Sequence, residues 1–144
     1  MGLEPTANIV ERMAAADRKK LGRRGETRAE TVHRVTTALE RKIHDQFSSF
    51  CRRHKIAVWH SHPTRKSSIR TGLPDFLCLK NSRALLIEFK VLPNKLSKEQ
   101  DEVFAELESG GNYVHVIEED APGEAYRLAT ALVRDYFHLT QGLE

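Results

Sequence analysis

The sequence predicts an α/β domain in which a central β-sheet is flanked by helices. Two observations lead to this fold class. Segments with apolar residues at helical spacing alternate with short apolar segments of strand length. The chain has 144 residues, 40% of them hydrophobic, which suits one compact domain with a single core. The predicted order of elements is helix, helix, three strands, helix, strand and helix.

Composition argues against membrane and secreted proteins. No apolar run approaches the roughly 20 residues that cross a bilayer, and we find no signal peptide. Two cysteines, Cys51 and Cys78, make no disulfide framework, so we expect an intracellular, cytoplasmic protein. The net charge of +3 is unevenly placed, because residues 46–74 contain no acid and residues 100–123 contain no Lys or Arg. A basic segment can attract a polyanion, although a solvated surface gives the same pattern.

The first predicted helix covers residues 6–21, with Thr6 or Asn8 as its cap. The segment around it is highly charged. We therefore divide the chain into an N-terminal helical arm, residues 1–26, and a folded domain, residues 27–144. The sequence leaves open whether the arm is mobile or binds a partner.

A second helix is predicted to begin after Thr27, because Thr27 and Glu30 match a capping box. Its apolar residues recur at helical spacing and form one continuous arc: Val32, Val35, Leu39, Ile43, Phe47 and Phe50. Glu40 lies inside this arc. A carboxylate on a core-facing stripe needs a partner, which is either a basic residue or a functional site.

Three strands follow, at residues 56–60, 75–80 and 84–91. A polar and basic loop, residues 63–71, separates the first two, and a two-residue turn, Asn81-Ser82, joins the other two as a hairpin. The second and third strands are apolar on both faces. We therefore expect them to be central and covered on each side.

The remaining elements have clear boundaries in the sequence. A capping box at Ser97 and Gln100 opens a third helix, and Gly110-Gly111 ends it. Residues 113–117 are predicted as a fourth strand and residues 124–137 as a last helix.

The hairpin places two acidic residues opposite one another. If Lys80 pairs with Arg83, then Asp75 faces Glu88 across the ladder. Like charges directly opposite are destabilising, and a divalent cation bound by both carboxylates removes the conflict. Lys90 lies two residues after Glu88 and points to the same face. The spacing predicts a metal site with a cation beside it; the ordinary alternative is an ion pair between Lys90 and either acid.

These residues resemble a nuclease signature. Pro74-Asp75 followed by Glu88-Phe89-Lys90 resembles the PD-(D/E)xK motif. Together with Gly72-Leu73 before Pro74, Leu96-Ser97-Lys98-Glu99-Gln100, and Gly110-Gly111 before a strand, it makes the chain similar to the stand-alone form of the VRR-NUC family over residues 40–117.

The resemblance implies a restriction-endonuclease-like core with a central mixed β-sheet, and Mg²⁺- or Mn²⁺-dependent cleavage of DNA. It implies that Asp75 and Glu88 bind the metal with the Phe89 carbonyl and Glu40, and that Lys90 is the catalytic lysine. Gln100 matches the family's glutamine, although its place in a capping box gives it a structural explanation too. Stand-alone members are similar to Holliday-junction resolvases that act as homodimers, which makes a structure-selective homodimer plausible.

Other residues near the predicted site have competing interpretations. Four basic residues are candidates for phosphate contacts with branched or duplex DNA: Arg65, Lys66, Arg70 and Lys95. The alternative is that these side chains are simply solvated. His60 and His62 share a strand face. Phosphate contact or exposure is favoured there over zinc, because no matching ligand pair is present. Trp59 is expected in the core.

The sequence therefore predicts a metal-dependent DNA endonuclease. Three alternatives stay open. The first is a non-catalytic nucleic-acid-binding module that uses the basic loop. The second is a sequence-specific or mobile-element endonuclease, and the third is a partner protein that uses its N-terminal helix.

Overall fold

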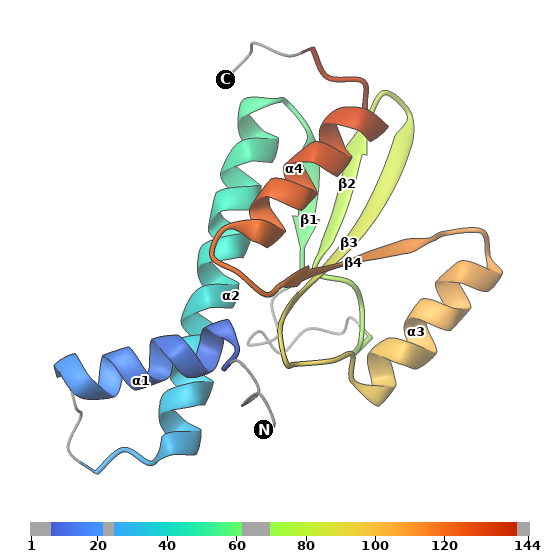
Figure 1. Ribbon diagram of the computed structural model, residues 1–144. Helices are drawn as coiled ribbons and strands as arrows, with labels where there is room; N and C mark the ends of the chain where they lie inside the picture. The colour runs from blue at the N-terminus through green and yellow to red at the C-terminus, as the bar shows by residue number, and fades with distance from the viewer. Residues whose placement is uncertain (1–6, 22–24, 62–69, 141–144) are drawn as a thin grey trace, which may run out of the picture.

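A four-stranded mixed sheet forms the centre of the molecule (Figure 1). The computed structural model describes residues 7–21, 25–61 and 70–140. The strands are β1 (Ala57–His60), β2 (Phe76–Lys80), β3 (Arg83–Val91) and β4 (Val114–Glu119), and they lie side by side in that order. β1, β2 and β3 are antiparallel neighbours, and β4 runs parallel to β3. The predicted α/β class with a mixed sheet is confirmed.

The helices lie on both faces of this sheet. They are α1 (Ile9–Leu21), α2 (Arg28–Arg53), α3 (Lys98–Ser109) and α4 (Glu124–Tyr136). α2 and α4 contact each other on one face, where α2 also contacts β1 and β3, and α4 contacts β4. α3 packs against β4 and the other face, apart from α2 and α4 (Figure 1). Within the described ranges, no helix is both long and apolar enough to span a membrane.

The helix starts follow the predicted capping residues. The Thr27 and Ser97 side chains accept backbone N–H groups in complete capping boxes at α2 and α3. α1 begins after Asn8, whose Oδ1 accepts the Glu11 N–H at 2.9 Å. β4 continues two residues past its predicted end, because Glu118 and Glu119 still pair with Lys90 and Val91 of β3. Glu119 is buried, and its carboxylate accepts the N–H of Ala125 in α4.

The first helix contributes to the main core. Ile9, Val10 and Ala14 are buried in the same cluster as the apolar arc of α2. Polar contacts add to this packing, because the guanidinium of Arg34 in α2 bonds to Asp17 of α1 and to Glu26. The division of the chain at residue 26 into an arm and a domain stays a prediction.

The β2–β3 hairpin has the predicted register. Lys80 pairs with Arg83, and the two residues between them, Asn81 and Ser82, have positive φ angles of 53° and 60°. Two successive positive φ angles are typical of the type I′ turn, whose twist matches that of the flanking strands. Alternation along β2 then separates Phe76, which faces α2, from residues such as Leu77 on the opposite face.

Coverage of the sheet differs from the prediction. β2 and β3 are central, but α3 lies over β3 and β4, so Leu77 and Leu79 of β2 are only half-buried. Trp59 was expected in the core, and this prediction is wrong, because 68% of its surface is exposed. It lies on the edge strand β1 opposite Leu77, on the face turned away from α2, where none of the described helices covers it.

Gly72 allows the segment before Asp75 to approach α3 closely. Its φ is +93°, and a Cβ added there would lie 2.7 Å from the carbonyl oxygen of Glu99 and 3.1 Å from the Gln100 nitrogen. Both are backbone atoms of the first turn of α3, which have little freedom to move. The absence of a side chain at Gly72 therefore couples the position of Asp75 to that of α3.

We expect Gly72→Ala to lower the free energy of unfolding by more than Gly111→Ala does. Gly111 also has a positive φ, +86°, but a Cβ there would meet no atom within 4 Å. The left-handed backbone costs about 1–2 kcal/mol for a residue with a Cβ, and at Gly72 the clash with α3 is added. Urea denaturation of both variants measures the difference, and equal losses would contradict the close packing of this segment on α3.

Candidate active site

The carboxylates of Asp75 and Glu88 lie together at the end of the β2–β3 ladder. The last pair of this ladder is Phe76 and Ile87, so the next residues, Asp75 and Glu88, face one another. The Asp75 N–H donates to Glu88 Oε2, and the Phe89 N–H donates to Asp75 Oδ2, both at 2.9 Å. Each acid is thus held by a backbone N–H of the other strand, and the two negative charges are close together.

Glu88 is buried, with 2% of its surface exposed. Burial, and then the neighbouring charge of Asp75, raise the pKa of Glu88 from its usual 4.5 to about 7. Three groups act in the other direction: the charge of Lys90, the Asp75 N–H and the Gln100 amide. The folded chain therefore holds this carboxylate in a place that disfavours its charge.

Lys90 places a cation beside the acidic pair. Its Nζ lies 3.4 Å from Glu88 Oε1, and only 16% of its side chain is exposed. The ion pair considered as the ordinary alternative is therefore present. Because it forms with the same carboxylate that faces Asp75, it also brings the three predicted residues to one place.

Gln100 makes contacts with both the cap of α3 and the acidic pair. Its Oε1 accepts the Ser97 N–H at 3.0 Å, which completes the capping box of α3. Its Nε2 donates to Glu88 Oε1 at 2.6 Å. The first turn of α3 thus delivers an amide donor to the buried carboxylate, and the helix cap orients that amide.

Glu40 reaches the same region from α2. Burial raises the pKa of its carboxyl, and the charge of Asp75 raises it further. The charges of His44 and Lys90 lower this pKa, as does a hydrogen bond with the Asn94 side chain. The acid inside the apolar arc is therefore within electrostatic reach of both Asp75 and Lys90.

The donor set fits a hard divalent cation. Among the described residues, no three His, Cys, Asp or Glu side chains are spaced to hold a metal ion together. Mg²⁺, however, usually keeps several waters and needs only one or two carboxylates. Asp75 and Glu88 supply two such carboxylates, and their mutual repulsion is what a cation would relieve.

The family model of the VRR-NUC domain matches residues 10–120. This chain belongs to the VRR-NUC family. It is therefore a nuclease-type domain. The match extends beyond residues 40–117, where the sequence motifs lie, and includes most of α1. No curated protein matches the chain.

A histidine in this VRR-NUC domain was missed in the sequence. His44 Nε2 lies 3.2 Å from Asp75 Oδ2, and His60 Nε2 lies 3.0 Å from His44 Nδ1. These distances allow His60 to donate to His44, and His44 to donate to Asp75. The His60 ring also stacks on Phe76, with centroids 4.4 Å apart. A signal was present, because His44 follows Glu40 by four residues and so shares its helix face.

The predicted DNA-contacting residues are scattered or lie beyond the described part. Arg65, Lys66 and His62 lie outside the described residues. Arg70 is exposed and donates two hydrogen bonds to the Glu106 carboxylate in α3. Lys95 is exposed after β3. Contact of these residues with DNA stays a prediction.

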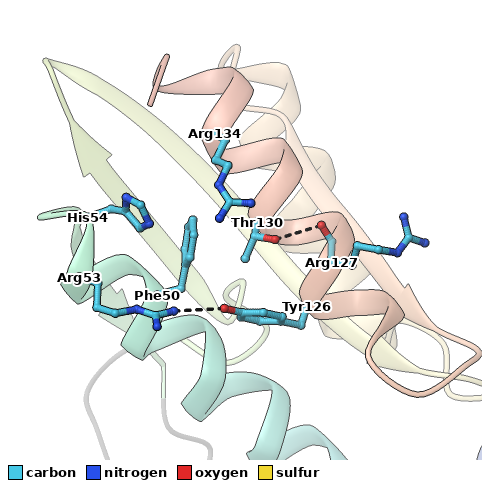
Figure 2. Close-up of a pocket in the computed structure, with 7 residues that line it drawn as sticks. All are labelled: Phe50, Arg53, His54, Tyr126, Arg127, Thr130 and Arg134. Carbon is cyan, nitrogen blue, oxygen red and sulfur yellow. Dashed lines mark hydrogen bonds between the residues drawn. The ribbon is translucent and has the colours of Figure 1, made fainter. Parts of the chain in front are cut away.

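A basic pocket lies between α2 and α4, away from the acidic pair (Figure 2). Its volume is about 370 Å³, and its lining residues are Phe50, Arg53, His54, Tyr126, Arg127, Thr130 and Arg134. Arg53 donates to the Tyr126 hydroxyl at 3.3 Å, and the Arg134 guanidinium lies over the Phe50 ring. In Figure 2 the Arg127 side chain points away from the pocket. None of the predicted site residues lines it.

We expect Glu88→Gln to make the fold more stable at high pH. The pKa of Glu88 is raised in the folded state. The stability that comes from a protonated Glu88 is therefore fully present below pH 4.5, and it is lost as the pH rises through about 7. A shift of this size corresponds to roughly 3 kcal/mol. The difference in unfolding free energy between Glu88→Gln and the wild type should grow by about this amount from pH 4.5 to pH 8.

Urea denaturation in EDTA at the two pH values measures this difference. Glu108→Gln is the matched control, since Glu108 is exposed on α3. A difference that stays constant with pH would show that the Glu88 charge costs the fold little.

Proposed function

We propose that this VRR-NUC domain is an endodeoxyribonuclease that hydrolyses phosphodiester bonds with Mg²⁺ or Mn²⁺. The observation that supports this most is the pair of opposed carboxylates, the buried Glu88 and the half-buried Asp75, with Lys90 at 3.4 Å from Glu88. A fold has no stability reason to hold two acids together in a place that disfavours charge. Such strained groups concentrate at functional sites.

Asp75, Glu88 and the Phe89 carbonyl would hold the metal, and Glu40, which interacts electrostatically with Asp75, would join them when the ion binds. A divalent ion at such a site makes coordinated water a better nucleophile and offsets negative charge on the phosphate. Oxygen donors of this kind are those that Mg²⁺ and Mn²⁺ prefer.

The remaining residues of the site position these groups. The Lys90 ammonium orients the attacking water or offsets charge that develops on the phosphate. Gln100 holds Glu88 through its amide, and His44 holds Asp75 from the α2 side. Together they keep both carboxylates in one orientation, as metal ligands require.

The preferred substrate in this proposal is branched DNA, such as a Holliday junction, cut by a homodimer. This rests on the resemblance to stand-alone family members that are similar to junction resolvases. Arg70 and Lys95 are exposed and would contact the backbone phosphates.

We expect metal-dependent cleavage that is lost in two variants. With Mg²⁺ or Mn²⁺ the wild type should cut an end-labelled four-way junction, and EDTA should abolish the cut. Lys90→Ala and Asp75→Asn should each lower the rate by about 100-fold or more, because each removes an interaction made with the reacting groups. The panel also contains a flap, a nicked duplex, a plain duplex and a single strand.

Two outcomes would contradict the proposal in different ways. Cleavage retained in both variants would show that the reaction takes place elsewhere. DNA binding without cleavage of any substrate by the wild type would instead favour a non-catalytic binding module.

A second comparison separates the two roles of Gln100. Ser97→Ala removes the hydroxyl that caps α3 but leaves the amide on Glu88, whereas Gln100→Ala removes half of the capping box and the Glu88 contact. Each should cost about 1 kcal/mol of stability for the lost cap. Only Gln100→Ala should lower kcat, by about 10-fold or more, since it frees a metal-ligand carboxylate. Equal kcat losses in both variants would reduce Gln100 to a capping residue.

A further inference from the structure

Trp59 is the most exposed large apolar side chain in the described part of the chain. Its exposed fraction is 68%, compared with 64% for Tyr113 and 38–40% for the other exposed large apolar residues, Met13, Val116 and Leu128. A single exposed apolar residue has no special meaning by itself. The position of Trp59 on the sheet distinguishes it from the others.

Trp59 lies on the face of the sheet that carries Glu88 and Lys90, whereas the Asp75 carboxylate lies at the end of β2 and also contacts His44 of α2. It pairs with Leu77 of β2, and two residues later the Ser61 N–H donates to the Asp75 carbonyl at 2.9 Å. Trp59 and Asp75 are therefore diagonal neighbours on adjacent strands. Such neighbours lie about 7–8 Å apart, within reach of an aromatic side chain. Because side chains alternate along β3, Glu88 and Lys90 share this face.

Among the described residues, the part of this face that lies over β2 is apolar and only partly covered. Leu77 and Leu79 on β2 are half-buried, because α3 covers only β3 and β4. On the other side of Glu88 lies its neighbour in β4, Val116, which is 38% exposed. The acidic pair thus lies between two exposed apolar side chains, with the indole on the side of β1.

The chemistry of a nucleotide fits this arrangement. A phosphodiester at the acidic pair has a nucleobase one sugar away on either side. A flat and exposed indole binds a nucleobase by stacking, without regard to its sequence. In an intact duplex the bases are stacked on one another, so only an unpaired base presents a free face.

We propose that Trp59 stacks on an unpaired nucleobase next to the phosphodiester held at Asp75, Glu88 and Lys90. This inference rests on the proposed nuclease function, and it specifies the substrate as DNA with unpaired bases near the cut. Flaps, frayed junction centres and single strands present such bases, whereas a fully paired duplex does not.

Trp59 is the only tryptophan in the chain, so its fluorescence reports on this residue alone. We would titrate the wild type in EDTA, at low ionic strength, with a labelled flap, the same flap lacking one base at the branch, and a plain duplex. Anisotropy of the label measures binding, and the indole emission measures stacking. The abasic flap is the matched control, because it has the same number of phosphates and lacks only one ring.

The flap should quench Trp59 emission, and the abasic flap and the duplex should quench it less. Trp59→Leu should weaken flap binding by about 5- to 150-fold and change duplex binding little. Trp59→Phe, which keeps an aromatic ring, should lose less. Binding of the flap with unchanged emission, or equal losses for the flap and the abasic flap, would overturn the proposal. Emission that shifts with protein concentration before DNA is added would show that a second copy covers Trp59, and would overturn it too.

Failure of this inference differs from failure of the nuclease proposal. If stacking is absent but metal-dependent cleavage is lost in Lys90→Ala, the nuclease stands and Trp59 has no part in it. If no DNA is bound or cut, both proposals fail together.

Discussion

The arrangement of the site depends on one unfavourable interaction, the approach of the Asp75 and Glu88 carboxylates across the β2–β3 hairpin. Burial and the charge of Asp75 raise the pKa of Glu88 to about 7, so the sheet holds this acid where its charge is disfavoured. The register that causes this is set by a two-residue turn with two positive φ angles. A register shifted by one residue would turn one of the acids to the other face of the sheet.

The surrounding elements each supply a group that opposes this repulsion. The hairpin itself contributes the N–H groups of Asp75 and Phe89, and β3 contributes the Lys90 ammonium. α3 contributes the Gln100 amide from its capped first turn, which Gly72 allows to lie close to the segment before Asp75. α2 contributes His44. These contacts hold the carboxylates in place but compensate the like charges only in part, because the pKa of Glu88 stays raised. The proposed divalent cation would compensate the remaining charge.

Local patterns in the sequence were sufficient to predict that the acidic pair, Asp75 and Glu88, comes together. The turn residues and strand alternation predicted that Asp75 faces Glu88, and the spacing in β3 placed Lys90 beside them. The capping pattern at Ser97 predicted where α3 begins, although not that the amide of Gln100 would reach Glu88.

Several contacts between distant segments were not predicted. His44 meets Asp75 across 31 positions in the chain, and Arg70 meets Glu106 across 36. Tryptophan is a large apolar residue that is often in the core, but the exposure of Trp59 depends on how far α3 extends over the sheet. No local pattern shows that extent, because it follows from the tertiary packing of α3 on β4.

Metal-linked stability is the measurement that tests whether Asp75 and Glu88 are held together for a divalent cation. The free energy of unfolding would be measured with EDTA and with increasing Mn²⁺ for the wild type, Asp75→Asn and Glu88→Gln. We expect Mn²⁺ to stabilise only the wild type, by about 2.7 kcal/mol when its concentration is 100 times the Kd. Equal stabilisation of all three proteins, or none of the wild type, would contradict it.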